Sequence, residues 1–210
     1  MAKIDMGRSR FKIQRRLGVE LPGLGKAGAL ERKPYGPGQH GMQRKKLSDY
    51  TVRLLEKQKV MFNYGLRESQ LRNYVKNSKK IKTASWVDTM IVTLESRLDN
   101  VVFRLNWAPS TPAARQMVTH KHIKVNGKTV NVPAYQVKPN DVIEISDTGA
   151  RSGNYLQAKK APRISSIPAC LTKEASGEKE KAKMVAKPLP EDIPFAFEKR
   201  LVIEYYWKVK

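Results

Sequence analysis

Side chains that can bind phosphate gather on three predicted elements between residues 94 and 145. Helix and strand periodicity places them on the exposed faces of these elements, and no acidic side chain shares those faces. The set comprises Arg97, Asn100 and Arg104 in a first helix, Arg115, Gln116, Thr119 and His120 in a second helix, and His122, Lys124 and Asn131 in a hairpin. Such groups contact phosphate oxygens without reading base sequence. The arrangement is expected of a small module that lies against a nucleic-acid backbone.

Two short helices must position the first seven of these side chains. The first helix ends near Leu105 and carries an apolar stripe of Leu98, Val101, Val102 and Leu105. The second begins at Ser110, a good N-cap, with Pro112 in its first turn. Its apolar stripe consists of Ala114, Met117 and Val118.

A hairpin must position the remaining side chains. Asn126-Gly127 predicts a two-residue type I′ turn, because both residues tolerate a positive φ. This turn pairs Lys124 with Thr129. The expected buried face of the hairpin consists of Ile123, Val125, Val130 and Val132.

Residues 97–143 also contain a dense series of motifs. They read R-L-D-N-V-V-x-R-L and then A-R-Q-x-V-x-H-x-H-I-x-V-N-G-x-x-V-N-x-P-x-Y-x-V-x-x-x-D-x-I. This order resembles the S-four RNA-binding domain. Several RNA-binding proteins and RNA-modifying enzymes share that domain, so this part of the resemblance implies RNA binding and little more.

The flanking sequence narrows the resemblance. The motifs are PGQHG at 37–41, LSDY at 47–50, EKQK at 56–59 and YGLRESQL at 64–71. They resemble the family of bacterial and organellar S-four ribosomal proteins, over roughly residues 11–147 and again at 201–206. The resemblance implies a non-enzymatic constituent of the small (30S-type) ribosomal subunit in the cytoplasm. It also implies direct binding to the 5′ domain of 16S-type rRNA as a primary assembly protein, contacts with neighbouring ribosomal proteins, a role in translational accuracy and, in many bacteria, repression of the protein's own operon through its mRNA.

The charge of the chain supports a polyanionic partner. Among 210 residues, 41 Lys and Arg oppose 19 Asp and Glu, which gives a formal net charge of +22. Self-repulsion on this scale destabilises a lone compact fold, and nucleic acid relieves it. A membrane is disfavoured because apolar runs are short, and residues 1–30 lack the apolar core of a secretory signal. We therefore expect an intracellular protein with no membrane partner and no independent homo-oligomer.

The expected fold class is α+β, with three parts. Residues 1–46 form a basic RNA-binding arm that orders on RNA. Residues 47–93 form a helical domain, with helices from Ser48 to about Tyr64, over about 68–77 and from Ser85, and the segment 164–210 completes this domain. Residues 94–163 form the inserted S-four domain, two helices plus short antiparallel strands. In the C-terminal segment, 173–187 is expected to be solvated, and Leu201, Ile203, Tyr205 and Trp207 alternate as in a strand buried on one face.

The expected RNA-binding residues come from all three parts. They are Arg44, Lys45, Lys46, Arg53, Lys57, Arg72, Arg97, Arg104, Arg115, Gln116, His120, His122, Lys124, Asn126 and Lys128.

Other functions are less well supported. An RNA-modifying enzyme with the same module needs a catalytic domain, and no carboxylate pair, triad or phosphate loop is evident. A metal site of His40, His120 and His122 is weaker than RNA-facing imidazoles, and a DNA-binding protein with a long recognition helix is weaker still. The single cysteine, Cys170, is expected to be an inert small hydrophobe. We expect no catalytic residues, no metal and no cofactor.

Overall fold

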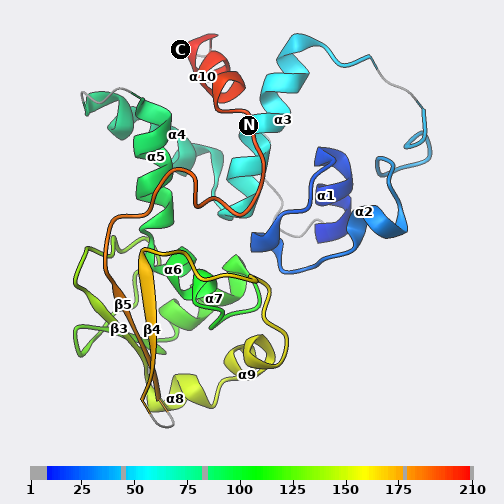
Figure 1. Ribbon diagram of the computed structural model, residues 1–210. Helices are drawn as coiled ribbons and strands as arrows, with labels where there is room; N and C mark the ends of the chain where they lie inside the picture. The colour runs from blue at the N-terminus through cyan, green and yellow to red at the C-terminus, as the bar shows by residue number, and fades with distance from the viewer. Residues whose placement is uncertain (1–8, 44–45, 82–84, 177–178, 209–210) are drawn as a thin grey trace. The chain divides into compact units, whose positions relative to one another are not determined.

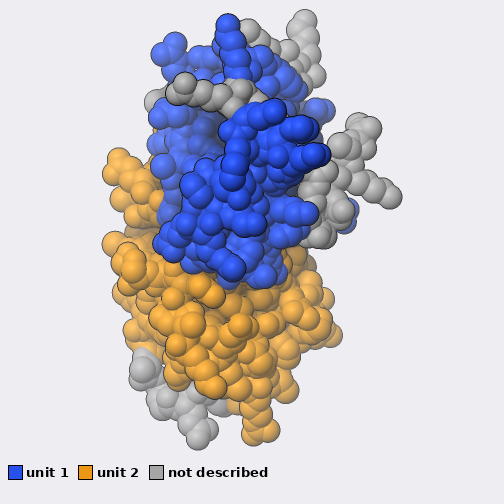
Figure 2. Space-filling model, turned by 90° about the vertical axis from the view of Figure 1, so that its right-hand side faces the viewer, with its two compact units in different colours: residues 1–87, 194–210 blue, residues 88–193 orange. Residues whose placement is uncertain are grey.

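The computed structural model describes residues 9–43, 46–81, 85–176 and 179–208, and its mixture of helices with one antiparallel sheet confirms the α+β class (Figure 1). The chain divides into two compact units (Figure 2). Unit 1 comprises residues 1–87 and 194–210, and unit 2 comprises residues 88–193.

Unit 1 is helical. Its elements are α1 (Arg10–Leu17), the 3-10 turn η1 (Pro22–Leu24), α2 (Ala29–Arg32), α3 (Asp49–Asn63), α4 (Glu68–Lys80) and α10 (Lys199–Lys208), and α5 (Trp86–Glu95) begins at its boundary. The Ser48 side chain accepts a hydrogen bond from the Thr51 N–H, which confirms the predicted cap of α3.

Residues 10–32 of the basic arm have a core of their own. Ile13 and Leu17 of α1 are buried, and the Gln14 side chain donates to the Lys26 carbonyl at 2.7 Å. The Gly23 N–H of η1 donates to the Asn63 side chain of α3 at 3.0 Å. The Gln14 bond therefore holds two parts of the arm together, and the buried bond of Gly23 attaches the arm to α3.

The C-terminal segment forms helix α10, so the predicted strand over 201–207 is wrong. The same residues carry a helical pattern, because Val202, Tyr205 and Tyr206 are spaced for one helix face and are buried. Tyr205 lies 6.0 Å from Tyr50 of α3 between ring centroids. Packing on α3 selects the helical period over the alternating one.

Unit 2 combines a small sheet with helices. Its helices are α6 (Leu98–Arg104), α7 (Thr111–Thr119), α8 (Asp147–Ala150) and α9 (Gly153–Lys160), and its strands are β1 (Ile123–Val125), β2 (Lys128–Thr129), β3 (Val142–Ile145), β4 (Leu171–Ser176) and β5 (Lys179–Met184). The antiparallel sheet has the order β2-β1-β3-β5-β4 (Figure 1).

Strands β4 and β5 correct the expectation of a solvated segment over 173–187. Ala182 of β5 lies opposite Ile143 of β3, and Ala182, Met184 and Leu171 are buried in the core of unit 2. In β5, Ala182 and Met184 alternate with Lys181 and Lys183, and this period-2 pattern lets the two apolar residues join the core while these two lysines lie on the other face. Residues 164–193 therefore group with unit 2 and not with the helical domain that they were expected to complete.

Trp107 and Glu180 connect the β4–β5 hairpin to the core of unit 2. The buried Trp107 indole donates to the Glu180 carboxylate at 2.7 Å, and Lys173 pairs with the same carboxylate at 2.7 Å. Burial opposes ionisation of Glu180, but the hydrogen bonds and charge of Lys173 outweigh it and lower the pKa of this carboxyl. The hairpin is thus held by apolar packing and by a paired carboxylate.

Candidate RNA interface

Helix α7 presents the first part of the interface. The Ser110 hydroxyl accepts from the Ala113 N–H at 3.4 Å and Pro112 occupies the first turn, which confirms the predicted start of the helix. The predicted stripe of Ala114, Met117 and Val118 is buried. The opposite side exposes Gln116, Thr119 and His120.

A tight turn connects α7 to β1. The N–H of Lys121 donates to the Val118 carbonyl at 3.0 Å, and the N–H of His122 donates to the Met117 carbonyl at 3.0 Å. Lys121 is exposed and has a φ of 63°, in the left-handed region. Lys121 was not among the predicted RNA-binding residues, and its position between His120 and His122 was the only sign of such a role in the sequence.

The β1–β2 hairpin extends the interface. Asn126 and Gly127 have φ values of 50° and 76°, and Lys124 lies opposite Thr129, so the predicted turn and register are confirmed. The Asn126 amide donates to the Asp141 carboxylate at 2.9 Å and accepts from the Val142 N–H at 2.9 Å. Lys128 is exposed. Val132 is also exposed, contrary to the predicted buried face, because β2 ends at Thr129.

We name these exposed residues the α7–hairpin surface: Gln116, Thr119, His120, Lys121, Asn126 and Lys128.

Helices α8 and α9 add neighbours that sequence reasoning missed. The Thr148 hydroxyl of α8 lies 3.4 Å from the Nδ1 of the half-buried His122, and the Asn154 amide of α9 donates to Gln116 at 3.2 Å. Gly149 allows α8 to approach β1 closely, since a Cβ at this position would lie 2.7 Å from the His122 carbonyl oxygen. These contacts fix one edge of the α7–hairpin surface.

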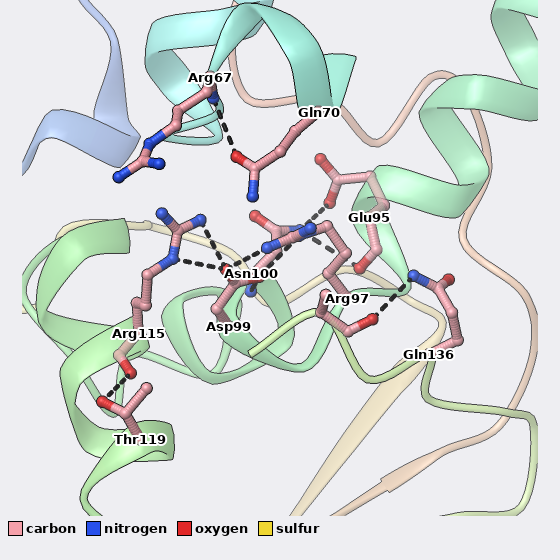
Figure 3. A network of polar contacts seen from close by, with 10 residues as sticks. Arg67, Gln70, Glu95, Arg97, Asp99, Asn100, Arg115, Thr119 and Gln136 are labelled. Carbon is pink, nitrogen blue, oxygen red and sulfur yellow. Dashed lines mark hydrogen bonds and ion pairs between the residues drawn. The ribbon is translucent and has the colours of Figure 1, made fainter. Parts of the chain in front are cut away.

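A buried carboxylate holds Arg97 and Arg115 (Figure 3). Asp99 is 1% exposed and accepts from Arg97 at 2.6 Å and from Arg115 at 3.0 Å. Arg97 is 3% exposed, whereas the side chain of Arg115 retains 28% of its accessibility. The structure therefore buries Arg97, while Arg115 of α7 is partly exposed.

A second buried network contains Arg104 (Figure 3 labels two of its members, Glu95 and Asn100). Arg104 is 3% exposed, and its Nε donates to the Glu95 carboxylate at 2.9 Å. The Asn100 amide donates to the same carboxylate at 2.8 Å. The expectation that Arg97, Asn100 and Arg104 form an exposed face is wrong. Asp99 and Glu95 neutralise the two arginines inside the unit, which makes their burial tolerable.

Lys124 lies on a sheet face that carries acidic residues. It is half-buried and lies opposite Glu144 of β3, which in turn pairs with Lys181 of β5 at 2.8 Å. The hairpin itself carries no acidic side chain on its open face, but the neighbouring strand β3 places Glu144 beside Lys124. The α7–hairpin surface is the stronger candidate for contact with a polyanion.

The comparisons with known proteins agree with these features. Residues 96–143 match the S4 domain family, and residues 6–95 match the ribosomal protein S4/S9 N-terminal domain family. Over 197 residues, or 94% of each chain, this chain is 51% identical to the small ribosomal subunit protein uS4B of Bdellovibrio bacteriovorus. The chain belongs to the uS4 family of small ribosomal subunit proteins.

Further relatives extend the similarity along nearly the whole chain. The identity is 44% over 202 residues with the uS4 protein of Nostoc punctiforme and 41% over 199 residues with that of Methylobacillus flagellatus. Each comparison covers 94% of this chain and 95% of the relative. The resemblance found in the sequence motifs is thus confirmed, and the uS4 family consists of structural proteins, not enzymes.

In this uS4-family chain, unit 1 pairs part of its positive charge internally. Lys57 is 5% exposed and pairs with Glu68 at 2.6 Å, which corrects its expected outward position. Arg53 pairs with Glu204 of α10 at 2.7 Å, and this hydrogen bond lowers the pKa of Glu204. Arg72 also pairs with Glu68, at 3.2 Å, but its side chain is about half exposed. Arg72 therefore remains a candidate for RNA contact.

Three of the predicted RNA-binding residues, Arg44, Lys45 and Lys46, belong to the arm. Lys46 is exposed, whereas Arg44 and Lys45 lie outside the described residues.

The histidines of the uS4-family chain form no metal centre within the described ranges. The rings of His120 and His122 are 6.0 Å apart between centroids. No cluster of three or more metal-ligating side chains occurs among the described residues. Within the same residues, every helix is too short or too polar to cross a membrane.

Proposed function

We propose that this chain binds rRNA directly, within the 5′ domain of 16S-type rRNA, as a structural constituent of the small ribosomal subunit. The observation that carries the proposal is the α7–hairpin surface, which displays Lys121 and Lys128 beside amide, hydroxyl and imidazole groups in a chain of net charge +22. Membership in the uS4 family supports the same partner.

The chemistry of this surface suits folded RNA. Proteins recognise double-stranded RNA mainly through shape, phosphates and 2′-hydroxyl groups. Lysines provide ammonium groups for phosphates, while Gln116, Thr119 and Asn126 provide donors and acceptors for riboses. The surface therefore positions the protein on the RNA backbone without a base code.

Footprinting of the isolated rRNA 5′ domain tests the proposal. We expect the purified chain to protect a defined set of backbone positions from hydroxyl radicals. Lys128→Gln is expected to weaken this protection, because Lys128 is exposed on the α7–hairpin surface. Lys187→Gln is the matched control, since it removes the same charge from an exposed position outside this surface. A folded chain that gives no protection would refute direct binding.

Membership in the family supports three finer proposals. We propose that the chain is a primary assembly protein, so that it binds naked 5′-domain rRNA before other ribosomal proteins and then contacts its protein neighbours. Order-of-addition reconstitution tests this role, because a requirement for another protein would contradict it.

The other two roles concern translational accuracy and control of the protein's own operon. Misreading by subunits reconstituted with and without the chain tests the role in accuracy. Competition between the rRNA fragment and the leader of the chain's own mRNA tests operon repression. Failure of the mRNA to compete would remove repression and leave rRNA binding intact, because the two RNAs are assayed separately.

A further inference from the structure

Four residues other than glycine have a positive φ in the described part of the chain: Asn106, Lys121, Asn126 and Asn140. The left-handed region is unfavourable for residues with a Cβ, and Asn is the residue type that most often tolerates it. Lys121 is the one member of this set that is not an asparagine. Its conformation therefore requires an explanation.

Two of the asparagines have clear structural roles. The Asn106 side chain accepts from the N–H groups of Arg163 and Ile164, each at 3.1 Å, and the Asn126 side chain bonds both Asp141 and Val142. In each case the side chain hydrogen-bonds the residue with positive φ to a segment that is distant in sequence. The cost of the conformation is thus offset within the fold.

Lys121 has no comparable compensation. It is exposed, and no hydrogen bond or ion pair joins its ammonium to another residue in the described ranges. The backbone bonds of Lys121 and His122 to α7 form the hydrogen-bond pattern of a helix end at which glycine usually occupies the left-handed position. Glycine would make these bonds without strain, so the lysine side chain is retained at a cost in stability.

We propose that Lys121 is an RNA-contacting residue whose ammonium binds a phosphate of the rRNA, and that the strained turn exists to present it between α7 and β1. Strained backbone persists at sites where function requires the geometry. The neighbours of Lys121 fit this role, since His120 is exposed on the α7–hairpin surface and His122 is held by Thr148 of α8. This inference rests on the proposed function.

Two substitutions separate the charge of Lys121 from its strain. Lys121→Gly removes both, whereas Lys121→Gln removes the charge and keeps a Cβ at the left-handed position. We expect both variants to bind the rRNA 5′ domain about tenfold more weakly. We also expect the slope of log affinity against log salt to fall by about one in both, as for the loss of one phosphate contact. Only Lys121→Gly is expected to melt at a higher temperature, by about 2–4 °C.

Two further variants provide matched controls. Lys121→Arg keeps the charge and the strain, so it should retain the affinity and the salt slope. Lys138→Gln removes an exposed lysine elsewhere in unit 2 and should change the affinity by less than Lys121→Gln does.

Each outcome decides one part of the inference. Wild-type affinity and salt slope in Lys121→Gln would overturn the phosphate contact. A melting temperature of Lys121→Gly at or below that of Lys121→Gln would overturn the strain. If the wild-type chain itself ignored the rRNA fragment, the proposed function would fail, and the comparison of the two melting temperatures would still test the strain.

Discussion

At the scale of single residues, pairing with a carboxylate distinguishes the buried arginines of unit 2 from exposed lysines such as Lys128. Arg97 and Arg104 are neutralised by Asp99 and Glu95 inside unit 2, whereas Lys128 remains exposed on the α7–hairpin surface. Removal of one member of a buried pair leaves the other charge unpaired in a medium of low dielectric constant. Buried and exposed cations should therefore respond differently to substitution.

Arg104→Ala is expected to destabilise the fold by about 3–5 kcal/mol, because it leaves Glu95 buried without its cation. Lys128→Ala is expected to change the free energy of unfolding by no more than about 0.5 kcal/mol, as for a surface substitution, while weakening RNA binding. Urea unfolding and rRNA binding of both variants measure the difference. If Arg104→Ala unfolded at the wild-type midpoint and lost RNA affinity, the structural role of Arg104 would be wrong.

Cys170 is a second case in which the environment sets the chemistry. The residue is 6% exposed, and burial, followed by the charges of Asp192 and Glu95, raises the pKa of its thiol to about 11. Because the thiolate is the reactive form, a rise from 9 to about 11 lowers the thiolate fraction at pH 8 roughly a hundredfold. We expect alkylation of the native chain to be at least that much slower than alkylation in denaturant. Equal rates in both conditions would show that the site opens freely.

At the scale of elements, one sequence pattern can satisfy two periods. Residues 201–207 alternate as a strand would, but their aromatic residues also suit a helix face against α3. A strand would bury Trp207 on the same face as Tyr205, whereas the helix leaves Trp207 exposed. In the structure Trp207 is 82% exposed and Tyr206 is 6% exposed.

Tyr206→Ala and Trp207→Ala test this helix. We expect Tyr206→Ala to lower the free energy of unfolding by about 3–5 kcal/mol, as is typical for the loss of a buried aromatic side chain. Trp207→Ala should leave it nearly unchanged. Thermal unfolding of both variants decides, and the reverse order of stabilities would support the strand.

Helix α8 depends on the absence of one side chain. A Cβ on Gly149 would lie 2.9 Å from the His122 Cβ as well as close to its carbonyl, whereas a Cβ on Gly153 meets nothing within 4 Å. We expect Gly149→Ala to cost about 1–3 kcal/mol through overpacking against β1 and to weaken RNA binding by shifting His122. Gly153→Ala is the matched control and should be neutral in both assays. Wild-type stability of Gly149→Ala would show that α8 can move away without cost.

At the scale of the whole molecule, the excess of positive charge is the dominant physical feature. Internal pairs such as Arg53–Glu204 and Lys57–Glu68 use only part of it, and the formal net charge is +22. Charge of this size favours association with a polyanion through release of counterions. The affinity for RNA should therefore depend steeply on salt.

The expected salt dependence can be stated in numbers. Six to ten phosphate contacts imply a loss of roughly 10³–10⁵ in affinity between 50 and 200 mM salt. Filter binding of the rRNA 5′ domain at several salt concentrations measures the slope. A flat dependence would mean that contacts other than phosphate dominate the interface.

The sequence alone determined the features that depend on neighbouring residues. Ser48 and Ser110 begin their helices, and Asn126-Gly127 forms its turn, because hydrogen bonds within a few residues decide these structures. The family motifs and the net charge likewise required no coordinates to indicate an RNA-binding ribosomal protein.

Tertiary structure decided which cations face outward and which period each ambiguous segment adopts. Arg53 pairs with Glu204, which lies 151 positions away in the sequence, and the lysine-rich β5 is an inner strand because β3 and β4 pair with it on either side. Local periodicity contains no information about such distant partners. The buried arginines of unit 2 lie where folding brings a carboxylate against them, so the composition of the exposed basic surface is a property of the folded chain.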